Sequence, residues 1–126
     1  MQRIMLRSKI HRATVTEAIL DYEGSLAVDR DLIEAADMLP GERIQFANVA
    51  NGARAETYLI EAPRGSGTIC LNGAAARLGS PGDQLIIFSF CILDDGEART
   101  HKPIVVLVDA QNRIRHPEGE APAPGA

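Results

Sequence analysis

The stretch RIQFANVANGARAETYLIEA, residues 43–62, contains the clearest indication of the fold. At its centre is Asn51-Gly52, the dipeptide most typical of a tight β-hairpin turn, because both residues tolerate the left-handed backbone that such a turn needs. Strands are therefore predicted at 43–50 and 53–62, on either side of this turn.

Further strand patterns flank the hairpin. Residues 84–93 and 104–108 are nearly unbroken apolar runs, typical of strands that are covered on both faces. The other predicted strands cover 3–16 and 68–72. Many short strands separated by Gly, Pro and Asn predict a small, mainly-β barrel with short helices.

One convincing helix is expected, at the segment DLIEAADML. Asp31 is predicted as its N-cap, with Glu34 as the reciprocal partner three residues later. Its apolar positions are Leu32, Ala35, Ala36 and Leu39, and Pro40-Gly41 is predicted to end it. A single helical turn is also predicted at 73–76.

Length and composition limit the class of protein. With 126 residues, the chain is long enough for one domain, predicted at 1–115, and the segment 116–126, rich in Pro, Gly and Ala, is predicted to be a disordered tail. A net charge of −4 argues against nucleic-acid binding, and no apolar run is long enough for a membrane helix. No secretory signal follows Met1, so a cytoplasmic location is expected.

Cysteines and histidines give no indication of a metal site. Cys70 and Cys91 both lie in apolar runs and are predicted to be buried thiols. His11, His101 and His116 are scattered along the chain, without the spacing of metal ligands.

Two strands place polar side chains on one face, since alternate residues share a face. Arg54, Glu56 and Tyr58 form one such set, and Arg7, Lys9 and His11 form another. Most such sets are simply solvated. A face with an arginine and a tyrosine can also bind a carboxylate and donate a proton.

Three Gly-Ser steps are present: Gly24-Ser25, Gly65-Ser66 and Gly79-Ser80. Such steps are ordinarily loops. A serine hydroxyl can also attack the preceding carbonyl, and elimination from the resulting ester leaves an α-keto group on the new N-terminus. Glycine before the serine eases this because it has no Cβ. Spacing alone leaves the choice among the three open.

Four segments, in a fixed order, carry a family resemblance: KIHRATVT at 9–16, DYEGS at 21–25, NGARAETY at 51–58 and LNGAAARL at 71–78. Together they resemble the pyruvoyl-dependent aspartate 1-decarboxylases. The similarity extends without an evident insertion to about residue 115. Each motif is weak alone, and all four in register are highly specific.

The resemblance implies self-cleavage between Gly24 and Ser25. Residues 1–24 would form a β chain, and an α chain, with 25–115 as its folded part, would begin at a pyruvoyl group made from Ser25. The implied fold is a double-psi β-barrel, assembled as a homotetramer with active sites between neighbouring protomers. Thr57 and Asn72 match residues that assist cleavage, Thr57 by stabilising the oxyanion.

The implied reaction converts L-aspartate to β-alanine and CO2 for pantothenate biosynthesis, with no metal and no pyridoxal phosphate. The pyruvoyl carbonyl would form a Schiff base with the substrate amine. Tyr58 matches the proton donor, and Arg54 and Lys9 supply cations for two carboxylates, in an order that stays open. Backbone N–H groups of Gly73, Ala74 and Ala75 suit an anion. The remaining matches to active-site neighbours are His11, Tyr22 and Ile86.

Two features depart from that pattern. At Ala47 a large aromatic is expected in the family, so either the pocket is enlarged or the adjacent Phe46 fills the space. An untwisted strand would also place Thr57 on the face opposite Arg54 and Tyr58.

Two other interpretations compete with this one. A non-catalytic β-barrel that binds a partner or anion through its basic face would remain one intact chain. A hydrolase that uses Cys70 or a serine with His101 or His11 lacks both a strand-to-helix nucleophile turn and an acid partner.

Overall fold

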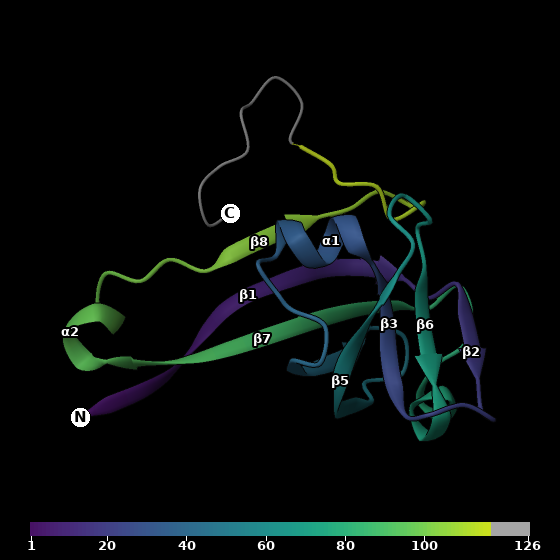
Figure 1. Ribbon diagram of the computed structural model, residues 1–126, viewed down its shortest axis with the longest axis horizontal. Coiled ribbons are helices and arrows are strands. Elements are labelled where there is room, and N and C mark those ends of the chain that lie inside the picture. Colours follow the sequence, from purple (N-terminus) through teal and green to yellow (C-terminus); the bar gives the residue numbers. More distant parts are fainter. Residues whose placement is uncertain (117–126) are drawn as a thin grey trace.

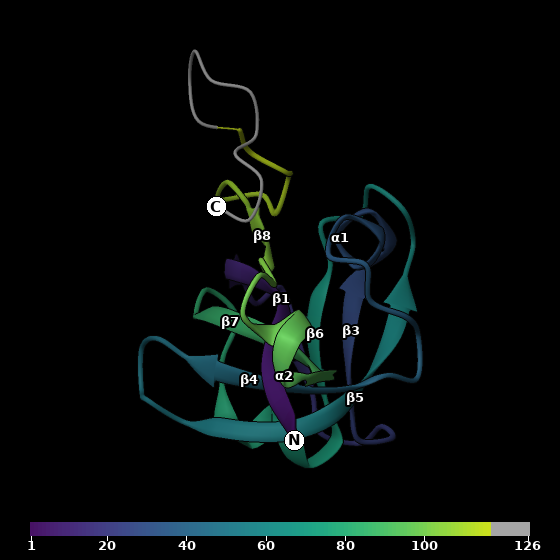
Figure 2. The ribbon, with the colours of Figure 1, turned by 90° about the vertical axis from the view of Figure 1, so that its left-hand side faces the viewer.

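The computed structural model describes residues 1–116, which form a mainly-β structure (Figures 1 and 2). The strands are β1 (Gln2–Thr14), β2 (Glu17–Ile19), β3 (Ser25–Asp29), β4 (Arg43–Asn48), β5 (Arg54–Ala62), β6 (Ile69–Asn72), β7 (Gln84–Asp94) and β8 (Ile104–Leu107). The helices are α1 (Arg30–Ala35), the 3-10 helix η1 (Gly73–Leu78) and α2 (Asp95–Ala98). The prediction of a mainly-β fold with short helices is confirmed.

The strands join in the order β2-β6-β3-β5-β4-β7-β1-β8. Neighbours in the sheet are parallel for β2 and β6, β3 and β5, and β1 and β8, and antiparallel elsewhere. Figure 2 shows the sheet curving around a common interior. This curvature brings β3 and β5, far apart in sequence, into direct pairing.

The core is aliphatic, as expected for a chain with few aromatic residues. Alternate residues of the central strands point inward, and the fully buried ones include Ile10, Leu26, Leu59, Leu85 and Ile87. Phe46 is the one fully buried aromatic side chain among residues 1–116.

The predicted hairpin is present, with a longer turn than expected. β4 ends at Asn48 and β5 begins at Arg54, so the connection is not a two-residue turn. The Asn48 side chain accepts a hydrogen bond from the Ala50 N–H, and the Asn51 side chain accepts one from the Ala53 N–H, both at 2.8 Å. These side-chain bonds add to two main-chain bonds across the connection, from the Asn48 N–H to the Ala53 carbonyl oxygen and from the Gly52 N–H to the Asn48 carbonyl oxygen, both at 2.8 Å. Gly52 adopts the expected positive φ of +75°.

The predicted N-cap of α1 is wrong by two residues. Asp29, not Asp31, caps the helix, and its carboxylate accepts from the Asp31 N–H at 2.8 Å. The same carboxylate also accepts from the N–H groups of Gly65 and Gly67, far along the chain. The helix ends at Ala35, so Leu39 lies beyond it and is exposed.

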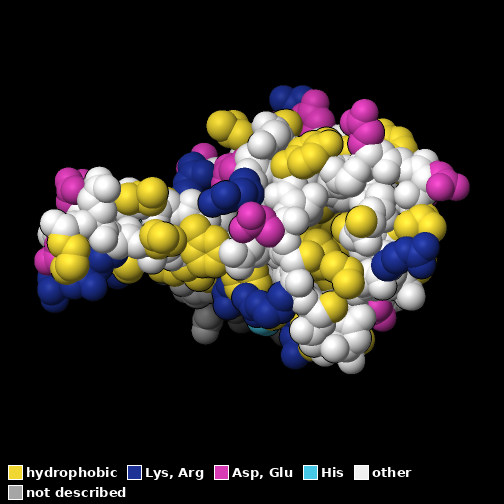
Figure 3. Space-filling view, turned by 90° about the horizontal axis from the view of Figure 1, so that it is seen from below, with side chains coloured by type: hydrophobic (Ala, Val, Ile, Leu, Met, Phe, Trp, Pro, Cys, Tyr) yellow, Lys and Arg dark blue, Asp and Glu magenta, His cyan; other side chains and the backbone are white. Residues whose placement is uncertain are grey.

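Strands β1 and β7 extend past the body of the molecule as an arm, with α2 at its tip (Figure 1). Hydrophobic side chains run along this arm (Figure 3), and those of Ile4, Phe90 and Ile92 are exposed. Residues 84–93 are therefore not covered on both faces throughout. Cys91 lies on the arm and is only half-buried, so the prediction that both thiols are buried is right only for Cys70.

The predicted tail from 117 onward lies outside the described residues. Within residues 1–116, no helix has both the length and the apolar character to cross a membrane. The same part of the chain contains no group of three acidic, histidine or cysteine side chains placed to hold a metal ion.

Candidate active site

The Gly24-Ser25 step lies where β3 begins, and Ser25 is completely buried. Register explains its surroundings, because Ser25 of β3 pairs directly with Asn72 of β6. The Asn72 Nδ2 donates to the Ser25 Oγ at 3.1 Å, and that hydroxyl donates to the Glu23 carbonyl oxygen at 3.2 Å. The serine is thus held in one orientation beside the peptide bond that precedes it.

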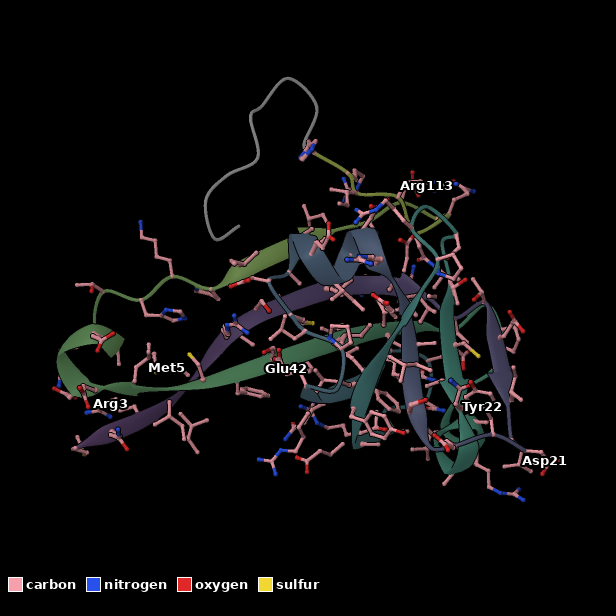
Figure 4. The ribbon with its side chains drawn as sticks, viewed as in Figure 1. Arg3, Met5, Asp21, Tyr22, Glu42 and Arg113 are labelled. Carbon is pink, nitrogen blue, oxygen red and sulfur yellow. The ribbon has the colours of Figure 1, made fainter. Side chains whose placement is uncertain are left out.

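Gly73 packs directly against the backbone before that bond. Its φ is +66°, and a Cβ there would lie 2.7 Å from the Gly24 Cα and 2.8 Å from the Tyr22 carbonyl oxygen. Only glycine fits such an approach without moving one of the two segments. Figure 4 shows Tyr22 beside η1, at the end of the molecule away from Arg3 and Met5 on the arm.

A pocket of about 520 Å³ opens next to this junction. Its lining comes from the residue before Ser25, the start of β5 and the helix η1: Gly24, Ala55, Glu56, Thr57, Tyr58, Ala74, Ala75, Arg77 and Leu78. Five candidate site residues therefore meet here, namely Gly24, Thr57, Tyr58, Ala74 and Ala75. The pocket touches four consecutive residues of β5, so the pleat does not separate Thr57 from Tyr58.

Two charged residues of this pocket, Glu56 and Arg77, had no role assigned from the sequence, although Glu56 belongs to the predicted polar set with Arg54 and Tyr58. Arg77 lies one helical turn after Ala74 on η1, within the segment LNGAAARL. That spacing is the signal that could have identified it, since residues three apart on a helix turn share a face.

A second group of candidate residues occupies the outer face of the β1, β7, β4 and β5 strands. Across the sheet, Ile86 pairs with Ala47, and Ala47 pairs with Arg54. The Arg54 guanidinium lies 5.4 Å from the centre of the Phe88 ring, and Phe88 pairs with Lys9. Stacking on this ring orients the guanidinium.

His11 belongs to the same outer group, and one of its ring nitrogens lacks a hydrogen-bond partner within residues 1–116. Its Nδ1 is buried without a hydrogen-bond partner among the described residues. Burial, followed by the nearby charges of Lys9 and Arg12, lowers the pKa of His11 below its usual value. The ring is therefore neutral at pH 7 and can act as an acceptor or a donor.

The outer group and the pocket are separate within one protomer. Lys9, His11, Arg54 and Ile86 do not line the pocket beside Gly24. Tyr22 is mostly exposed and does not line it either.

Ala47 is half-buried on the outer face, where it pairs with Arg54 on one side and Ile86 on the other. Phe46 points into the core and is fully buried, because it occupies the opposite face of β4. The alternative that Phe46 fills the space beside Ala47 is wrong.

Comparison with known proteins shows the family of the chain. The family model described as aspartate decarboxylase matches residues 1–115. The chain is 61% identical over 122 residues to the aspartate 1-decarboxylase of Pelotomaculum thermopropionicum. This alignment covers 94% of this chain and 92% of that relative. It is 62% identical over 114 residues to the aspartate 1-decarboxylase of Heliobacterium modesticaldum, over 90% of this chain and 86% of the relative. It is 54% identical over 123 residues to the aspartate 1-decarboxylase of Bacillus subtilis, over 98% of this chain and 97% of the relative. The chain belongs to the aspartate decarboxylase family.

Proposed function

We propose that the chain cleaves itself between Gly24 and Ser25 and then converts L-aspartate to β-alanine and CO2, which supplies pantothenate biosynthesis. One observation carries the proposal: at this step, in a member of the aspartate decarboxylase family, the Ser25 hydroxyl is buried and held by Asn72 beside the peptide bond that must break.

Cleavage begins with the Ser25 Oγ attacking the Gly24 carbonyl carbon. The Gly24–Ser25 C–N bond breaks, and the chain is then joined through an ester with a free amine on residue 25. Elimination takes the Cα proton and expels the Gly24 carboxylate. Addition of water and loss of ammonia convert the resulting dehydroalanine end to a ketone. Thr57 is assigned to stabilise the oxyanion of the first step, and its position in the same pocket as Gly24 supports this role.

The site fits a group made from residue 25. Gly73 leaves room for the Gly24 backbone, and the pocket begins at Gly24. A pyruvoyl group supplies a carbonyl that accepts electrons from the substrate as CO2 leaves. Asn72 and the start of η1 would hold it.

The remaining residues serve the substrate. Tyr58 lines the pocket and is assigned as the proton donor to the product carbon. Arg54 and Lys9 are assigned to the substrate carboxylates, since neither forms an ion pair within residues 1–116. The backbone N–H groups of Gly73, Ala74 and Ala75 are assigned to an anionic group of the substrate, and of these residues Ala74 and Ala75 line the pocket.

Assembly is part of the proposal, because the two groups of residues are separate in one protomer. A homotetramer of cleaved chains, as the family resemblance implies, would place the outer face of one protomer against the pocket of another. A cytoplasmic location completes the proposal. Membership of the family disfavours the interpretation as a non-catalytic binding barrel.

Intact-mass measurement with and without hydroxylamine tests the proposal. We expect two chains, residues 1–24 and 25–126, and only the larger should gain the mass of an oxime. Decarboxylation of aspartate should be lost after this treatment and should not need added pyridoxal phosphate. A single unmodified chain that still consumes aspartate would overturn the proposal.

A further inference from the structure

A third buried side chain extends the contacts of Ser25. The Cys70 Sγ donates a hydrogen bond to the Asn72 Oδ1 at 3.2 Å, while the Asn72 Nδ2 donates to the Ser25 Oγ at 3.1 Å. The three side chains are each at most 5% exposed. The thiol is therefore connected to the cleavage nucleophile through one amide.

The pairing of strands fixes this arrangement. Cys70 and Asn72 are two residues apart on β6 and so share a face, whereas Ile69 and Leu71 point into the core. Across the sheet Asn72 pairs with Ser25, and Cys70 pairs with Ala27.

The thiol determines which end of the amide faces Ser25. A half-turn of the Asn72 side chain would exchange its oxygen and nitrogen, so that an acceptor faced the serine and a donor faced the thiol. Sulfur is a weak acceptor, so this flipped state loses a buried hydrogen bond. Burial, and secondly the charge of Glu17 on β2, raises the pKa of the Cys70 thiol, which keeps it protonated and able to donate.

We propose that Cys70 is a positioning residue for self-cleavage: by donating to the Asn72 oxygen, it holds the amide nitrogen toward the Ser25 oxygen that attacks Gly24. The inference rests on the proposed function, since it assigns a role within the same cleavage step. In this orientation the Ser25 Oγ accepts a hydrogen bond from the Asn72 amide, and the serine hydroxyl donates to the Glu23 carbonyl oxygen. A donor at this oxygen stabilises the negative charge that develops as the hydroxyl proton is transferred, in the net step, to the residue 25 nitrogen that becomes the free amine.

The test compares Cys70→Ala with Cys70→Ser on the full chain. Freshly purified precursor of each variant is incubated at one temperature, and the loss of the intact chain is followed by mass. We expect cleavage of Cys70→Ala to be slower by about fivefold, as for the loss of one hydrogen bond. Cys70→Ser, which keeps a donor at the same place, should cleave within about twofold of the unsubstituted rate.

Thermal unfolding of each variant in a Ser25→Ala background separates positioning from loss of stability. Equal cleavage rates for Cys70→Ala and the unsubstituted chain would overturn the inference and leave the proposed function standing. Slow cleavage of both Cys70 variants would also overturn it, because the donor would then not be the cause. If Cys70→Ala fails to fold, slow cleavage of a stable Cys70→Ser still overturns the inference, and a rate near that of the unsubstituted chain supports it. Failure of the unsubstituted chain to cleave would overturn the proposed function itself.

Discussion

The cleavage junction and the outer sheet face differ in how completely one chain satisfies their polar groups. At the junction, Ser25 and Asn72 are buried and each makes hydrogen bonds within the chain. On the outer face, Arg54 contacts an aromatic ring, and the buried Nδ1 of His11 has no partner among residues 1–116. A bond-breaking step needs fixed geometry, which strand pairing supplies. A binding face needs groups that are still free for a ligand or a neighbouring protomer.

The strongest test of this difference between the two regions is to remove the proposed nucleophile, Ser25. Ser25→Ala should fold and neither cleave nor decarboxylate, because no hydroxyl remains to attack Gly24. Ser66→Ala is the matched control, since Ser66 is exposed and also follows a glycine. Mass measurement should find Ser25→Ala as one chain and Ser66→Ala as two. Activity retained by Ser25→Ala would end the assignment.

Tyr58→Phe tests whether proton donation is separate from cleavage. The change removes only the phenolic hydroxyl, so we expect normal cleavage and a fall in kcat of roughly a hundredfold or more. Tyr22→Phe removes the other tyrosine hydroxyl of the chain, and its effect should be smaller because Tyr22 does not line the pocket and is not assigned as the proton donor. If Tyr58→Phe does not cleave, the division of roles between Thr57 and Tyr58 is wrong.

Gly73→Ala tests the close approach at the junction. In a Ser25→Ala background, urea unfolding should show a loss of about 3 kcal/mol, from the positive φ together with the collision with Gly24. Gly52→Ala is matched in backbone angle, with φ of +75° and open space around it, and should lose only about 1 kcal/mol. Equal losses for the two variants would show that the packing against Gly24 contributes nothing.

An exposed ion pair outside both regions should make the stability of the fold depend on pH without affecting cleavage. Hydrogen bonds from Arg64, and then Arg30, lower the pKa of Glu34 to about 2. Because the folded pKa is depressed, the stabilisation is present above the usual glutamate pKa of about 4.3 and is lost as pH falls toward 2. Thermal unfolding from pH 5 to 2.5 should show a small loss that Arg64→Gln reduces, at unchanged cleavage. An identical pH profile for Arg64→Gln would contradict this role.

Local patterns predicted most of the strands, because hydrophobic alternation and turn residues act over short distances. The cap of α1 could not be predicted this way, since Asp29 is selected by amide groups of Gly65 and Gly67 from a distant loop. The half-exposure of Cys91 was missed for a related reason: an apolar run does not reveal that the strand continues onto an arm.

For the candidate site, the family resemblance supplied the residues and the structure supplied their grouping. No local pattern indicates that Thr57 and Tyr58 line a pocket with Gly24 while Arg54 does not, because this depends on which strands pair. The inward direction of Phe46 was predictable, since alternation along β4 places it opposite Ala47.

The pairing of β1 has a consequence for how the protein comes apart. Within residues 1–24, β1 lies between β7 and β8, and β2 pairs with β6, so a break after Gly24 would release nothing while the fold persists. Unfolding the cut protein would instead yield two separate polypeptides. Its melting temperature would then rise with protein concentration. Refolding would require the two polypeptides to associate, a bimolecular step that the newly synthesised single chain does not need.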